Sequence, residues 1–138
     1  MDIVKEYKFG YCTVQQRDDN ILAFEIQDGI EVDAAMVDEL IHVADTAIRG
    51  PFGILSNRIH SYSLSFAAMD ALAHYDRMSA LAIVVHHSRT RMLVETQNYF
   101  ISALSKKPIK VFLDTDAAIR WLHERLHELP TDTSGNRQ

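Results

Sequence analysis

The segment Leu81-Ala82-Ile83-Val84-Val85 is the strongest β-strand signal in the chain. It is short, continuously apolar and rich in β-branched side chains, a pattern typical of a strand that is covered on both faces. Strands of this kind lie in the middle of parallel sheets that carry helices against them. The segment therefore favours a helix-flanked sheet, and the other elements are interpreted around it.

Weaker strand patterns surround this segment. Tyr7, Phe9 and Tyr11 alternate with polar or small residues, a turn-forming cluster follows at 17–20, and apolar residues alternate again over 22–26. This pattern predicts an N-terminal β-hairpin with its turn at 17–20. Two further strands are expected at 52–55 and 109–113.

Helix patterns separate the later strands. Asp33 is a good N-cap for a helix that ends near Arg49, where Gly50-Pro51 stops it. Further helices are expected after the serine-rich stretch 61–65, from about 88 to 107, and from about 117 to 129 after a cap at Asp114 or Thr115. The order β-β-α-β-α-β-α-β-α predicts an α/β fold with a mostly parallel, mixed five-stranded sheet and four helices.

Composition limits the size and the setting of the fold. With 138 residues, 47% of them hydrophobic and 24% charged, we expect one domain over 1–129 and a polar C-terminal tail over 130–138. The single Cys12 cannot form an internal disulfide, which favours the cytoplasm, and we expect it to be an inert packing residue. No run is apolar enough for a signal peptide or a membrane span, and a net charge of −5 argues against nonspecific nucleic-acid binding.

The order of elements, together with three stretches of sequence, resembles the STAS domain and in particular its SpoIIAA-like branch. The three stretches are the serine-rich turn 61–65, ALAIVVH at 80–86 and KPIKVFLDTDAAIRWL at 107–122. The resemblance covers roughly residues 3–129. It implies a non-catalytic module that regulates or binds, as the anti-sigma-factor antagonists of the family do.

The same resemblance indicates where a switch would lie. In the antagonists, a serine at the start of the second helix is phosphorylated within an Asp-Ser-Ser-Gly turn. Ser63 and Ser65 are the candidates here, although the Asp and the Gly are absent. The alternative is structural, because serine is a common helix N-cap and turn residue.

A second candidate site follows the central strand. Ligands of helix-flanked parallel sheets collect beyond the carboxyl ends of the strands, where the next helix begins. His86, His87, Ser88, Arg89 and Arg91 are expected there and suit an anionic ligand such as a carboxylate or phosphate. The alternative is that one imidazole covers the edge of the core and the other is exposed.

His123-Glu124-Arg125-Leu126-His127 matches the zinc-hydrolase pattern H-E-x-x-H. The charges within and beside the motif, and the shortage of a third ligand downstream, favour a surface helix whose histidines flank the core. A zinc site through His123 and His127, with Glu124 as general base, is the less favoured alternative.

Trp121 falls beside the buried stripe of the same helix, so we expect it to pack under a neighbour or to form a dimer contact.

These observations predict a non-enzymatic regulatory or binding module without a cofactor or a metal. Its expected partner is a protein or a small-molecule ligand, and a homodimer is possible. The first alternative is a domain that binds a lipid-like or anionic ligand in an apolar pocket between sheet and helices, with the head group near Arg89, Arg91 and His86. The second alternative is the zinc hydrolase.

Overall fold

A computed structural model describes residues 3–58, 62–86 and 107–134. Its main sheet has six strands in the order β1-β2-β3-β5-β7-β8. Their bounds are Ile3–Lys8 for β1, Cys12–Arg17 for β2, Ile21–Ile26 for β3, Phe52–Arg58 for β5, Met78–Val85 for β7 and Ile109–Phe112 for β8. A second, two-stranded sheet pairs β4 (Glu31–Val32) with β6 (Ser63–Leu64) in parallel.

The main sheet is mixed and mostly parallel. β1, β2 and β3 pair antiparallel, whereas β3, β5, β7 and β8 pair parallel. β7 lies between β5 and β8, and seven of its eight residues are buried. This confirms the α/β class and the central place of the Leu81–Val85 segment.

The N-terminal hairpin prediction was wrong in its boundaries. Tyr7, Phe9 and Tyr11 do not share one strand, because the chain turns after β1 and Phe9 N donates to Cys12 O at 2.8 Å. The predicted turn at 17–20 is present, with Asn20 at a φ of 62°, but it joins β2 to β3. The sheet therefore has six strands rather than the predicted five.

Three helices lie within the described residues: α1 (Ala34–Ala47), α2 (Phe66–Ala73) and α4 (Thr115–Ser134). Asp33 caps α1 by accepting from Met36 N at 2.9 Å, and Ser65 caps α2 by accepting from Ala68 N at 3.0 Å. α4 does not end near Leu129 but continues into the segment predicted as a polar tail. The helix predicted over about 88–107 falls on 87–106, which lie outside the described residues.

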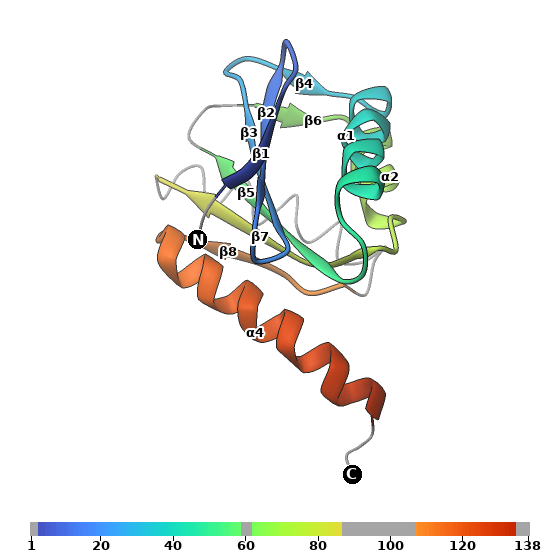
Figure 1. The fold of residues 1–138 in the computed structure, drawn as a ribbon. Helices are drawn as coiled ribbons and strands as arrows, with labels where there is room; N and C mark the ends of the chain where they lie inside the picture. Colours follow the sequence, from blue (N-terminus) through green and yellow to red (C-terminus); the bar gives the residue numbers. More distant parts are fainter. Residues whose placement is uncertain (1–2, 59–61, 87–106, 135–138) are drawn as a thin grey trace.

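The helices cover the two faces of the sheet (Figure 1). α1 and α2 pack together over one face, whose core includes Phe24, Ile54 and Leu81. α4 packs on the other face, where Leu122 is fully buried in a smaller core. Gly53 permits this approach, since an added Cβ would lie 3.0 Å from Leu122 Cδ2.

Within the described residues, no helix is both long enough and apolar enough to span a membrane.

The core under α4 depends on Leu122. Replacing this side chain, Leu122→Ala, removes fully buried methyl groups and leaves a cavity, so we expect a loss of about 2 to 5 kcal/mol in unfolding free energy. Arg120→Ala, an exposed position on the same helix, should change it by less than about 0.5 kcal/mol. Urea unfolding followed by circular dichroism measures both. Equal stability of the two variants would contradict the packing of α4 described here.

Candidate functional site

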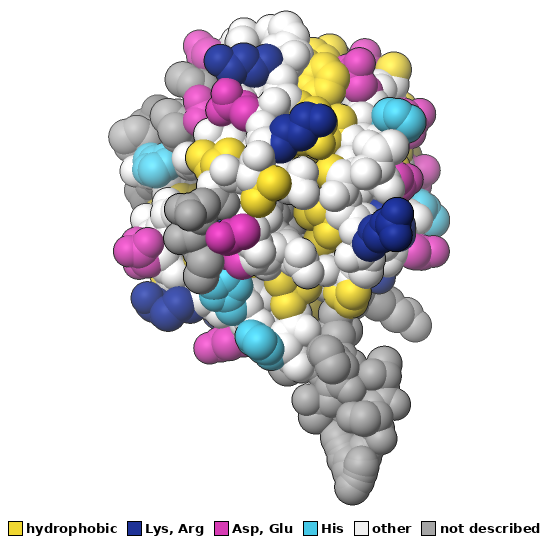
Figure 2. Space-filling view, in the orientation of Figure 1, with side chains coloured by type: hydrophobic (Ala, Val, Ile, Leu, Met, Phe, Trp, Pro, Cys, Tyr) yellow, Lys and Arg dark blue, Asp and Glu magenta, His cyan; other side chains and the backbone are white. Residues whose placement is uncertain are grey.

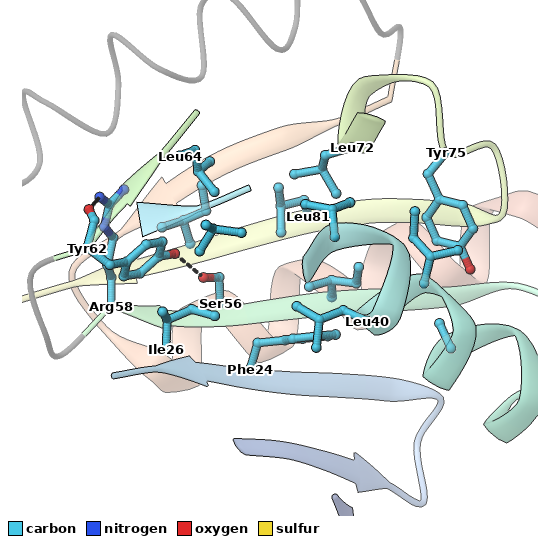
Figure 3. A pocket seen from close by; sticks show the side chains of 16 residues that line it. Phe24, Ile26, Leu40, Ser56, Arg58, Tyr62, Leu64, Leu72, Tyr75 and Leu81 are labelled. Carbon is cyan, nitrogen blue, oxygen red and sulfur yellow. Dashed lines mark hydrogen bonds between the residues drawn. The ribbon is translucent and has the colours of Figure 1, made fainter. Parts of the chain in front are cut away.

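An apolar cavity of about 100 Å³ lies between the main sheet and the helices α1 and α2 (Figure 3). Its walls come from both layers of the fold and from the two-stranded sheet. Most of the lining side chains are aliphatic or aromatic, and the exceptions are a serine and an arginine. The lining residues are Phe24, Ile26, Val32, Val37, Leu40, Ile41, Ala44, Ile54, Ser56, Arg58, Tyr62, Leu64, Leu72, Tyr75, Leu81 and Ile83.

The alternation of side chains along β5 gives the cavity one polar end. Successive residues of a strand point to opposite faces, so Ile54, Ser56 and Arg58 share the face below α1 and α2. The sequence of β5 is apolar at the start of the strand and polar at its end. The polar side chains therefore lie together at the carboxyl end of β5, whereas the part of the cavity over Ile54 is apolar.

Tyr62 brings the three polar residues of this end together (Figure 3). Its hydroxyl is 3.0 Å from Ser56 Oγ, and its carbonyl oxygen accepts a hydrogen bond from Arg58 Nη2. The guanidinium carbon of Arg58 lies 4.1 Å from the centre of the Tyr62 ring, a cation–π contact. We call these three residues the polar end of the cavity.

Arg58 is unusual among the charged residues that the structure describes because it is only 7% exposed. Burial lowers the pKa of Arg58 below its usual value, and the interaction with Tyr62 opposes that change. An arginine nevertheless keeps its proton in proteins, since its ordinary pKa lies above 12. The polar end therefore carries a buried positive charge held by an aromatic ring.

The opposite end of the cavity is closed by Tyr75, whose polar atom is already engaged. Its hydroxyl donates to Asp45 Oδ1 at 2.8 Å, and Arg77 Nη1 lies 3.0 Å from the same oxygen. These hydrogen bonds lower the pKa of Asp45, while burial and then the bond to Asp45 raise the pKa of Tyr75. Tyr75 thus contributes its ring to the cavity and its oxygen to a surface ion pair.

One member of the predicted anion site, His86, is described by the structure. His86 is exposed, with Nε2 3.2 Å from Asn57 Oδ1, and does not line the cavity. The other members of the predicted anion site, His87, Ser88, Arg89 and Arg91, lie outside the described residues.

The candidate switch serines both precede α2. Ser63 is exposed on β6, whereas the Ser65 hydroxyl is occupied as the N-cap of α2. Neither lines the cavity. The polar end of the cavity was not predicted from the sequence. The change from apolar to polar residues along β5 is the sequence signal that points to it.

The histidines of the H-E-x-x-H motif face a different groove, of about 500 Å³, between the β2–β3 turn and α4. His123 Nε2 is 2.8 Å from Asp19 Oδ2, and Arg17 donates to both oxygens of Asp19 at 3.1 Å. His127 is exposed. Over the described part of the chain, no group of three or more histidine, cysteine or acidic side chains is placed to hold a metal ion. His123 acts here as a link between α4 and the β2–β3 turn.

Two further residues have structural roles. Cys12 is fully buried, and burial raises the pKa of its thiol to about 12, as expected for an inert packing residue. Trp121 packs against Phe112 with ring centres 5.6 Å apart. The predicted packing role of Trp121 is thus confirmed.

Charge does not single out a docking surface on the face of the molecule shown in Figure 2. Acidic, basic and hydrophobic side chains are interspersed there rather than gathered by type. The cavity is therefore the more informative feature for a candidate site.

Comparisons with known proteins identify a family and a fold. Residues 15–126 match a family model described as "Domain of unknown function (DUF7793)". No curated protein matches. A solved structure of an uncharacterized protein from Shewanella loihica PV-4, of the DUF3478 family with a SpoIIAA-like fold, is similar with a TM-score of 0.55 and 18% identity. The match covers 88% of this chain and 98% of that chain, and it supports the SpoIIAA-like fold.

The link between Asp19, Arg17 and His123 predicts a pH-dependent contribution to stability. Burial alone would raise the pKa of Asp19, but the hydrogen bonds from Arg17 and His123 lower it below its ordinary value of about 3.9. A lowered pKa in the folded state stabilises the fold above the unfolded-state pKa, and this stabilisation is lost as the pH falls through the folded-state pKa. Asp19→Asn should therefore cost about 1 to 3 kcal/mol at pH 7, and the cost should shrink below about pH 4.

Urea unfolding from pH 7 to pH 3 measures this difference. Asp18→Asn is the matched control, because Asp18 is the exposed neighbour and should have little effect. A cost for Asp19→Asn that stays constant down to pH 3 would exclude the ionised carboxylate as its source.

Proposed function

The chain belongs to the DUF7793 family, and we propose that it is a non-enzymatic domain that binds a small apolar ligand between its sheet and the helices α1 and α2. The observation that carries this proposal is the apolar cavity in the larger core. Protein interiors are normally packed as closely as organic crystals. An apolar space of this size leaves its lining side chains without packing partners on one side, and an apolar ligand that fills it supplies those contacts.

The size of the cavity limits the ligand. An engineered cavity of roughly 150 Å³ lined by aliphatic and aromatic side chains binds benzene. At about 100 Å³ the present cavity is somewhat smaller, and drug-sized ligands occupy roughly 300 Å³ or more. A single ring or a chain of a few carbon atoms therefore fits this proposal better than the long acyl chain of a lipid.

The residues around the cavity favour binding over turnover. None of the described lining residues is a carboxylate, an imidazole or a thiol, the groups that usually act as general bases or nucleophiles. The polar groups at the polar end, a guanidinium and two hydroxyls, are suited to orienting a ligand, and the third hydroxyl of the lining, that of Tyr75, is engaged with Asp45.

Filling the cavity with protein atoms tests the proposal. In Val37→Phe a larger side chain on α1 enters the space, so we expect at least about a tenfold loss of affinity for benzyl alcohol while the protein stays folded. Ile119→Phe, the same kind of change on α4 against the other core, should leave the affinity unchanged. Titrations followed by amide NMR shifts measure both. Unaltered affinity in Val37→Phe, or the absence of binding to the wild type, would refute the proposed site.

A second candidate function is regulated association at the start of α2. It is supported by Phe66, which is 70% exposed directly after the Ser65 cap, and by the exposed Ser63 on the preceding strand. A large exposed aromatic side chain beside a modifiable hydroxyl suits a surface whose partner binding changes on phosphorylation. This function and ligand binding use different residues, so they are tested separately.

Phosphorylation by an extract of the source organism tests this second candidate. We expect labelling of the wild type and of Ser65→Ala, because the Ser65 hydroxyl is occupied at the helix cap, and loss of label in Ser63→Ala. Mass spectrometry of the labelled peptide identifies the site. Equal labelling of the wild type and both variants would remove these serines as the switch.

A further inference from the structure

We infer that the ligand of the cavity carries a carboxylate, which Arg58, Ser56 and Tyr62 bind at the polar end. The inference rests on the proposed ligand-binding function and narrows the ligand to a chemical class. That class is small carboxylic acids whose apolar part is a single ring or a short chain.

The first support is the position of the positive charge. Arg58 lines the cavity at the carboxyl end of β5 and is only 7% exposed. The ring of Tyr62 lies against the guanidinium, and the Tyr62 carbonyl accepts from Nη2, so the guanidinium is held in one orientation. A planar guanidinium fixed in this way matches the two oxygens of a carboxylate, and little side-chain entropy is lost on binding.

The second support is the hydroxyl pair. Ser56 and Tyr62 share one hydrogen bond of 3.0 Å, for which one of the two hydroxyls supplies the proton. Each hydroxyl carries one proton, so the proton of the other is not used in that bond. Within the described residues no second hydrogen-bond partner is found for either hydroxyl, and this proton remains for an acceptor in the cavity. A carboxylate is an acceptor only, and its oxygens suit such a donor.

The third support is the contrast between the two ends. At the opposite end, the Tyr75 hydroxyl is engaged with Asp45, and that carboxylate lies beside it. Because Arg77 also pairs with Asp45, an anionic head group would meet an ion pair that is already formed there, whereas it would meet a positive charge at Arg58. The ligand is thus oriented with its head at the polar end and its apolar part over Ile54 and Leu81 (Figure 3).

Charge favours a carboxylate over a phosphate. The described lining residues include one cation, and a carboxylate carries one negative charge. A phosphate monoester carries about 1.5 to 2 negative charges at neutral pH, and removing it from water costs more.

Benzoate and benzyl alcohol test the inference, because both have a single ring and only one of them is charged at pH 7. We expect the wild type to bind benzoate at least about tenfold more tightly, as for hydrogen bonds to charged groups. In Arg58→Met the preference should fall to within about twofold while benzyl alcohol still binds. Tyr62→Phe, which keeps the ring beside Arg58 and removes the hydroxyl, should lose part of the preference. Arg120→Met, at an exposed arginine of α4, should keep it.

The outcomes distinguish a failure of the carboxylate inference from a failure of the proposed ligand-binding function. Equal binding of the two probes to the wild type, or a preference that survives in folded Arg58→Met, overturns the carboxylate inference and leaves the apolar ligand site standing. If neither probe binds the wild type, the proposed function itself fails. Should Arg58→Met not fold, the wild-type comparison and Tyr62→Phe still decide the question.

Discussion

The parallel pairing of β5 with β7 is the interaction on which the rest of the structure depends. These two strands lie inside the sheet, between β3 and β8, and are buried on both faces over most of their length. Each face therefore needs a cover, which α1 and α2 provide on one side and α4 on the other. The α4 side is closely packed around Leu122, whereas the side below α1 and α2 retains a cavity. This difference between the two cores locates the proposed function.

The cavity is polar at one end because β5 changes character along its length. Ile54 is in the apolar part, while Ser56 and Arg58 project to the same face closer to the end of the strand. Tyr62, which lies just before β6, brings these two side chains together. The polar end thus combines a strand of the main sheet with the segment that enters the two-stranded sheet, and neither alone forms it.

Much of the fold could be predicted from the sequence, but little of the candidate site could. The apolar run over Leu81–Val85 and the caps Asp33 and Ser65 predicted the α/β class and two helices, because burial and capping are local signals. The strand boundaries near Gly10 were missed, since aromatic alternation continues through a turn that only backbone pairing reveals. Arg58 and Tyr62 could not be paired from sequence, as their contact depends on how the chain returns after β5.

A crystal structure of the full chain with benzoate tests the central claim most directly. We predict that the carboxylate lies within hydrogen-bond distance of the Arg58 guanidinium and that the ring fills the cavity between the sheet and α1. A structure in which benzoate lies elsewhere, or in which Leu40 and Leu72 close the cavity with no ligand inside, would contradict it.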